Sequence, residues 1–189
     1  GLTIEHGQTV PLSARLHTIE PGVTQGEVVV EGVPLSFHIE CDEPDWRHML
    51  WYDRRLMPGG TRLDFDAIRS TTLRPFGLIC VGPTSAGQTI EMRIGFSLRG
   101  VEQAKANLDA DRSAEGQPMF SLRRSDTETA WRDSLSRIDV DGGTEDRRTI
   151  FATALYHSLI KPCFAPDESP FWADKGPFVF DICTMWDIY

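Results

Sequence analysis

Hydrophobic and polar positions alternate with a period of two along most of the first hundred residues. Residues 34–41, PLSFHIEC, place Leu35, Phe37 and Ile39 on one side with polar residues between them, which is typical of a half-buried strand. Similar runs predict strands at 26–32, 49–53, 61–68, 76–82 and 89–98, and turn sequences such as MPGG at 57–60 separate them. Many short strands with frequent turns predict a β-sandwich rather than a parallel α/β sheet.

From Gly100 onward the pattern becomes helical. Helices are predicted over 101–111 and from 127 to shortly before Asp139, where apolar residues recur at helical spacing. A third helix is predicted over 144–161, with Thr144 as its N-cap and two acidic residues in its first turn. Its apolar residues cover a broad arc, so we expect much of its surface to be buried. They are Ile150, Phe151, Ala154, Leu155 and Leu159.

The segment from Cys163 to Phe180 is predicted to be a loop, because its prolines and glycines oppose regular structure. Its aromatic residues either anchor the loop or line a pocket; they are Phe164, Phe171, Trp172, Phe178 and Phe180. Residues 181–189, DICTMWDIY, resemble the first turn of another helix. One complete helix with one broken neighbour does not make its own core, so we expect the chain to be a piece of a larger protein.

Charge and composition limit the function. Acidic residues number 28 and basic residues 19, giving a net charge of −9, which opposes nucleic acid or an anionic membrane as a partner. No apolar run approaches the roughly 20 residues that span a bilayer. The four cysteines contain no C-x-x-C pair, which argues against structural zinc and favours buried or free thiols, with a disulfide as the alternative.

Trp186 and Asp187 are the most specific candidate ligand-binding residues in the sequence. A carboxylate accepts two sugar hydroxyls through charge-assisted hydrogen bonds, and an indole offers a flat apolar surface and one donor. An adjacent pair at the start of a helix, after an aromatic loop, can supply both. The alternative is a core tryptophan beside a helix-capping aspartate.

Two other residue pairs near the end of the chain are weaker candidates for catalytic groups. Asp181 and Asp187 could act as the acid and base of glycoside hydrolysis, but with 28 acidic residues such spacings are common. His157 and Ser158 are neighbours on a helix and point about 100° apart, so they form no catalytic dyad. We expect His157 to make a polar contact between helices or to reach the loop above.

The acidic stretch of Asp139, Asp141 and Glu145 does not match a calcium loop. An EF-hand needs glycine at the sixth position and an acidic residue at the twelfth; this stretch has Gly142 at the fourth and Ile150 at the twelfth. A turn followed by a helix cap explains it better.

Several phrases together resemble glycoside hydrolase family 92, the calcium-dependent α-mannosidases. They are GFSLRGVEQAKANLDAD at 95–111, WRDSLSRIDVDGGTEDRRTIFATALYHSLIKP at 131–162 and TMWDIY at 184–189. The resemblance covers about residues 75–189. It implies a β-sandwich at 1–99, a helical linker at 100–140 and, at 141–189, the beginning of an (α/α)6 barrel catalytic domain that is truncated here.

The resemblance also implies a function. Family members are inverting α-mannosidases with a glutamic acid that protonates the leaving oxygen, a carboxylate base and Ca²⁺. It places Asp187, with Trp186 as its companion, on the mannose of the −1 subsite. The catalytic residues and the Ca²⁺ ligands would come from later parts of the barrel, so the resemblance assigns neither to this chain, which we expect to be inactive alone. The expected partners are a mannose-containing glycan and the remainder of the barrel.

Two further interpretations stay open. The sandwich could be a non-catalytic carbohydrate-binding module, with Trp46, Trp51 or Tyr52 stacking on sugar, or a structural module that supports a partner domain. The compartment is also open, and we expect a secreted or periplasmic protein.

Overall fold

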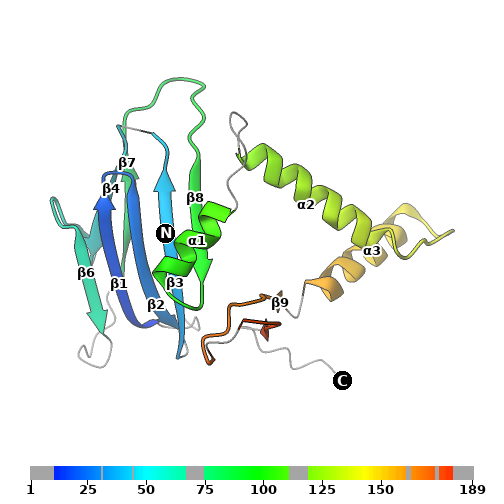
Figure 1. The fold of residues 1–189 in the computed structure, drawn as a ribbon. Coiled ribbons are helices and arrows are strands. Elements are labelled where there is room, and N and C mark those ends of the chain that lie inside the picture. Colours follow the sequence, from blue (N-terminus) through cyan, green and yellow to red (C-terminus); the bar gives the residue numbers. More distant parts are fainter. Residues whose placement is uncertain are drawn as a thin grey trace. The chain divides into compact units, whose positions relative to one another are not determined.

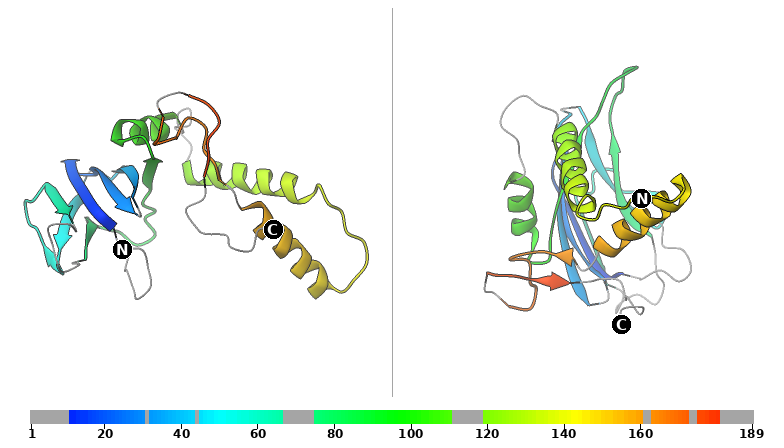
Figure 2. Two further views of the ribbon diagram at one scale, coloured as in Figure 1. Left: turned by 90° about the horizontal axis from the view of Figure 1, so that it is seen from below. Right: turned by 90° about the vertical axis from the view of Figure 1, so that its right-hand side faces the viewer.

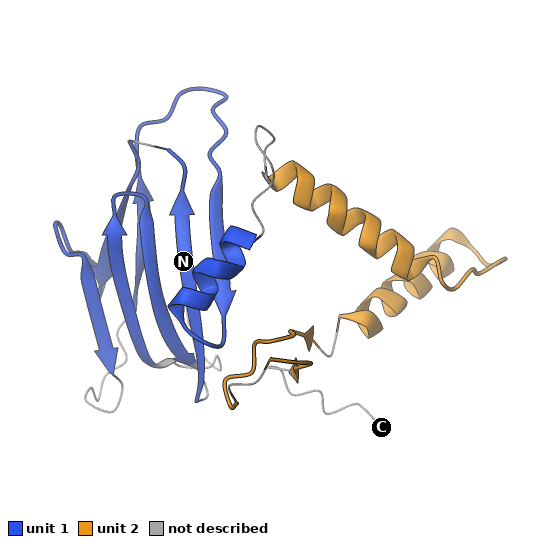
Figure 3. Ribbon diagram, viewed as in Figure 1, with its two compact units in different colours: residues 1–112 blue, residues 113–189 orange. Residues whose placement is uncertain are grey.

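The computed structural model describes residues 11–30, 32–43, 45–66, 75–110, 119–160, 163–172 and 175–180. Their contacts divide the chain into two compact units, residues 1–112 and 113–189 (Figure 3). Unit 1 holds eight of the described strands and the first helix, and unit 2 holds two further helices and a short hairpin. Each unit is described by itself.

Unit 1 contains two antiparallel sheets (Figure 1). The larger has the order β6-β1-β2-β3-β8, formed by β6 (Arg62–Asp66), β1 (Pro11–Glu20), β2 (Val23–Val30), β3 (Val33–Cys41) and β8 (Met92–Ser97). The smaller has the order β5-β4-β7, formed by β5 (Arg55–Leu56), β4 (Arg47–Tyr52) and β7 (Phe76–Val81).

The core lies where side chains of the two sheets meet. Ala14 and Leu16 of β1 and Leu63 and Phe65 of β6 pack with Leu50 of β4, whose side chain is 0% exposed. Each inward residue alternates with an outward one, as the period-two pattern predicts. The predicted β-sandwich is therefore confirmed.

Helix α1 (Val101–Ala110) covers part of the opposite face of the larger sheet, over β3 and β8 (Figures 1 and 2). It buries Ala104 and Leu108. Gly95 of β8 permits this contact, because a Cβ there would lie 2.2 Å from the carbonyl oxygen of Ala104. This face is polar, and α1 encloses two of its side chains, Ser36 and His38.

Unit 2 contains α2 (Met119–Leu135) and α3 (Glu145–Leu159). The rings of Trp131 on α2 and Tyr156 on α3 lie 4.6 Å apart between centroids. The N-cap at Thr144 is confirmed, since its side chain accepts a hydrogen bond from the backbone of Arg147. Gly142 and Gly143 precede it with φ of 86° and 74°, a conformation that glycine adopts without strain.

Three local details differ from the sequence patterns. Strand β1 lies within the β-rich first hundred residues, but the patterns did not indicate an individual strand there. Helix α2 begins at Met119 rather than at 127 and ends at Leu135, so Ile138 lies beyond it. The segment 163–180 is not wholly irregular, because β9 (Cys163–Phe164) pairs with β10 (Val179–Phe180) at its two ends.

Helix α3 also differs from its prediction. The sequence predicts burial over much of its surface, yet no residue of α3 is buried. Ile150 is 68% exposed, and Phe151 and Leu159 are exposed as well. Within unit 2 its helical neighbour is α2, which touches it through few residues. No closed helical barrel is present in the part of the chain that the structure describes.

Among the described helices, none combines the length and the apolar character that a bilayer crossing requires.

Candidate functional site

The predicted sugar-binding residues Trp186 and Asp187 lie outside the described residues, and so does Asp181. The segment that leads to them is described as far as Phe180.

The loop between β9 and β10, here called the aromatic hairpin (residues 163–180), is closed by backbone hydrogen bonds. Ala165 N–H donates to the Phe178 carbonyl at 2.8 Å, and Asp167 N–H donates to the Gly176 carbonyl at 2.9 Å. Gly176 N–H in turn donates to Asp167 Oδ1 at 2.6 Å. This reciprocal pair ties the two arms together below the tip of the loop.

Aromatic residues of this hairpin divide into an anchor and a displayed pair. Phe178 is 7% exposed, and Trp172 meets it edge-on with centroids 5.6 Å apart. Trp172 itself is 51% exposed, and its neighbour Phe171 is 74% exposed. Phe171 N–H donates to the Oγ of Ser169, a buried side chain. Phe178 therefore anchors the loop, whereas Phe171 and Trp172 are exposed on it.

On helix α3, the contact of Ser158 agrees with the prediction that it forms no dyad with His157, whereas the ring contact of His157 is with its own helix rather than with another one. Ser158 Oγ donates to the Leu155 carbonyl at 2.7 Å, so the hydroxyl has a backbone partner. The His157 ring lies 5.6 Å from the Tyr156 ring, which in turn contacts Trp131 of α2. The His157 ring therefore lies beside the Trp131–Tyr156 pair that joins the two helices. His157 and Ser158 do not form a base and a nucleophile.

The acidic stretch before α3 is a turn and a cap, as predicted. Asp141 Oδ1 accepts the backbone N–H of Gly142 at 2.8 Å, and Glu145 begins the helix directly after the Thr144 cap. Asp139 is exposed. Over all the ranges that the structure describes, no three His, Cys, Asp or Glu residues gather closely enough to hold a metal ion.

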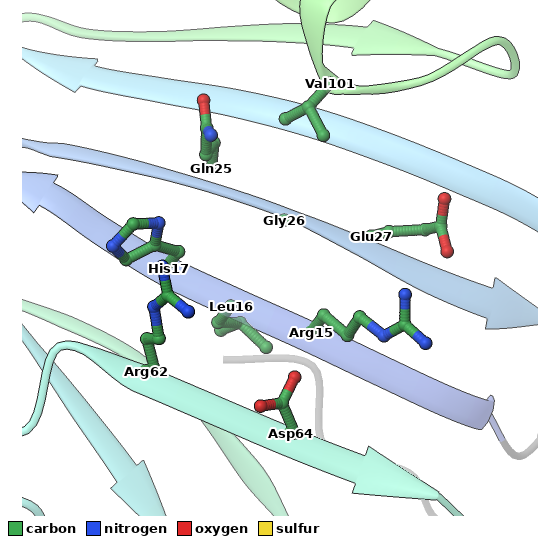
Figure 4. Close-up of a pocket in the computed structure, with 9 residues that line it drawn as sticks. All are labelled: Arg15, Leu16, His17, Gln25, Gly26, Glu27, Arg62, Asp64 and Val101. Carbon is green, nitrogen blue, oxygen red and sulfur yellow. The ribbon is translucent and has the colours of Figure 1, made fainter.

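A shallow hollow of about 300 Å³ lies on the polar face of the larger sheet, beside the first residue of α1 (Figure 4). Register places Arg15 of β1 directly between Glu27 of β2 and Asp64 of β6. The remaining lining residues are Leu16, His17, Gln25, Gly26, Arg62 and Val101. Sequence patterns did not indicate this hollow, because it depends on the order of β2, β1 and β6 in the sheet. Charges of both signs line it, so it has no clear preference for an anion or a cation.

One hydrogen bond joins the two sheets inside the sandwich. Thr24 of β2 and Nδ1 of His48 on β4 lie 2.8 Å apart, and both side chains are buried. Burial lowers the pKa of His48 from its ordinary value, because a low-dielectric interior disfavours the charged ring. On β7, which pairs with β4, burial raises the pKa of the Cys80 thiol, and the nearby Cys41 adds to the effect. Cys41, Cys80 and Cys163 are free thiols.

The aromatic residues proposed to bind sugar on the sandwich make packing contacts within unit 1. Tyr52 packs against the core. The Trp51 indole lies over Gly77, where a Cβ would be 2.8 Å from its Nε1, and the Trp46 indole lies over Gly82, where a Cβ would be 2.3 Å away. Trp46 Nε1 donates to the Pro83 carbonyl at 3.2 Å. Backbone therefore covers part of both indoles.

Comparison with known proteins points to one family. Residues 103–189 match the sequence model of the glycosyl hydrolase family 92 catalytic domain. A protein of Arthroderma benhamiae, described as an uncharacterized secreted glycosidase, is 32% identical over 126 residues. That alignment covers 65% of this chain but only 16% of the relative.

Solved structures show the same fold. The family GH92 inverting mannosidase of Bacteroides thetaiotaomicron VPI-5482 matches with a TM-score of 0.69 and 18% identity over 89% of this chain and 24% of its own. A GH92 α-mannosidase of Bacteroides thetaiotaomicron matches with a TM-score of 0.61 and 16% identity, over 84% of this chain and 21% of its own. The resemblance to glycoside hydrolase family 92 is confirmed, and the chain corresponds to a minor part of these proteins' length.

Proposed function

With the resemblance to glycoside hydrolase family 92 as the premise, we propose that this chain is part of an inverting exo-α-mannosidase that hydrolyses α-mannosidic bonds in mannose-containing glycans. The match of residues 103–189 to the family's catalytic domain carries the proposal, because it runs through the WD phrase itself. The sandwich fold shared with two mannosidases supports it.

The role proposed for this chain is substrate binding. Asp187 accepts hydrogen bonds from hydroxyls of the mannose in the −1 subsite, and its charge strengthens each of them. Trp186 presents an apolar ring to the C–H face of the sugar. The acid and the base of an inverting enzyme stand roughly 6.5–9.5 Å apart with a water between them, and we assign both to the remainder of the enzyme.

The remainder of the helical barrel is the proposed protein partner. Helix α3 carries exposed apolar side chains, among them Ile150 and Leu159, and burying them against further helices would stabilise both parts. Residues 1–189 alone should therefore not hydrolyse α-mannosides. Turnover by the purified 189-residue chain, at a rate near that of the longer enzyme, would contradict this assignment.

Calcium is proposed for the longer enzyme only. Following the family resemblance, we assign its ligands to the remainder of the enzyme and derive no step through it. Excess chelator should abolish turnover, and added Ca²⁺ should restore it. Full activity in excess chelator would show that turnover does not need calcium.

A secreted or periplasmic location is proposed because one relative is described as secreted. Fractionation of the source cells tests it, and recovery of the enzyme only from the cytosol would contradict it.

The direct test of the substrate-binding role is Asp187→Ala in the longer enzyme. It should lower kcat/KM for an α-mannoside by on the order of 10²-fold or more, because a charged, oriented hydrogen-bond acceptor is lost. Circular dichroism should show an unchanged fold. Asp139→Ala, which removes an exposed carboxylate upstream, is the matched control and should leave kcat/KM within a few-fold. Asp187→Ala activity within a few-fold of wild type would exclude Asp187 as a subsite residue.

A further inference from the structure

We propose that His48 is a pH-sensitive clamp between the two sheets of the sandwich: the ring holds the sheets together while it is neutral, and its protonation weakens their contact. The inference concerns unit 1 and does not depend on the proposed mannosidase function. It starts from a chain of three polar side chains in the interior, Thr18 of β1, Thr24 of β2 and His48 of β4.

This chain joins strands of both sheets through side-chain hydrogen bonds. Thr18 Oγ1 and Thr24 Oγ1 lie 3.0 Å apart, and Thr24 Oγ1 lies 2.8 Å from Nδ1 of His48. Thr24 is 0% exposed and His48 is 7% exposed, so both groups are removed from bulk solvent. In a low-dielectric interior such a bond is strong, and a polar group that is left unpaired there is costly.

The second ring nitrogen determines what protonation does. Nε2 of His48 is buried and has no hydrogen-bond partner among the described residues. A neutral ring has one N–H, which Nδ1 can carry and donate to Thr24, and Nε2 then holds only a lone pair. A protonated ring has an N–H on both nitrogens, so a positive charge and one donor are buried without a partner. Burying an unpaired charge is strongly unfavourable.

Among the described residues, no group that faces His48 compensates this charge. The larger sheet supplies Thr24 and, beyond it, Thr18, which are both uncharged. Register places Cys80 of β7 opposite His48, and burial raises the pKa of its thiol, which keeps that thiol neutral in neutral and acidic solution. Cys41 of β3, which also acts on the Cys80 thiol, is buried as well. No described carboxylate forms an ion pair with His48.

The direction of the pH effect follows from the proton balance. In the folded chain the pKa of His48 lies below its ordinary value of 6.5, because burial disfavours the charged ring. Below about pH 6.5 the unfolded chain therefore binds a proton at this position that the folded chain does not bind, and stability falls as the pH falls. Above that pH the ring is neutral in both states. The clamp thus holds at neutral pH and weakens in mild acid.

Urea unfolding of the 189-residue chain tests the proposal at about pH 7.5 and about pH 5.5, on either side of the ordinary histidine pKa. Circular dichroism of the strands is the probe. The wild-type folding constant should fall roughly five- to tenfold more over this interval than that of His48→Asn, because the asparagine amide can still bond to Thr24 but does not titrate. His157→Asn, on α3 of the other unit, is the control and should lose as much stability in acid as the wild type.

Equal losses in the wild type and in His48→Asn between the two pH values would overturn the proposal. If His48→Asn does not fold, NMR of the His48 ring in the folded wild type gives the answer instead. A ring that stays neutral down to about pH 5.5 supports the clamp. A ring that takes up its proton near pH 6.5, with the signals of the folded chain retained, contradicts it.

Discussion

The two units of this chain treat their apolar residues in opposite ways. In the sandwich, Leu50 is 0% exposed and side chains from both sheets enclose it. In α3, Ile150 is 68% exposed and no residue of the helix is buried. Both segments carry bulky apolar side chains, and the difference lies in what the described chain provides around them.

This contrast separates a unit that buries a core of its own from a unit that does not. Eight strands bring two sheets together and bury a shared core, which is enough for a sheet to be stable. Helices gain most of their stability from packing of an apolar face, and α3 has only a limited contact with α2 for that purpose. The sandwich contains its own core, whereas the helical unit presents apolar surface that suits further helices.

The largest stability effect should come from the sandwich core. Leu50→Ala removes a fully enclosed side chain and leaves a cavity, which should lower the free energy of unfolding by about 3 kcal/mol. Urea unfolding of the 189-residue chain, followed by circular dichroism, measures it. Leu56→Ala in β5, where the side chain is 50% exposed, is the control and should cost less than about 0.5 kcal/mol. Equal losses at both positions would show that Leu50 is not at the centre of a core.

The helical unit should give the smaller effect in this chain. Ile150→Ala should change the free energy of unfolding of residues 1–189 by less than about 0.5 kcal/mol, because the side chain is already exposed. The same change in the longer enzyme should cost about 2 kcal/mol or more, since the proposed neighbours bury it. A negligible cost in both proteins would contradict the idea that this face is covered.

Sequence patterns predicted the elements with the strongest periodicity. The strand at 34–41 and the Thr144 cap of α3 were correct to within a residue. Strand β1 was not singled out, although Ala14 and Leu16 alternate with Arg15 and His17, because the small side chain of Ala14 makes the alternation weak. The start of α2 at Met119 was missed because this helix is polar on most sides, as its Arg124–Glu128 pair illustrates, and its sequence carries little periodicity.

Features that depend on tertiary arrangement could not be predicted at all. The approach of α1 to Gly95 requires knowledge that α1 folds back on β8, and no local pattern states this. The hollow around Arg15 depends on the order of three strands. For the candidate site, composition alone suggested sugar chemistry at Trp186 and Asp187, and the family resemblance made it specific. Their role stays a prediction, because both lie outside the described residues.

Hydrogen exchange of backbone amides tests most directly whether α3 is built for neighbours outside this chain. Amides exchange slowly where the surrounding structure is stable and quickly where it opens easily. The strands around Leu50 should be protected in both the 189-residue chain and the longer enzyme. Amides of α3 should exchange within seconds in the 189-residue chain and become protected in the longer enzyme. Protection of α3 in the 189-residue chain equal to that in the longer enzyme would contradict the account.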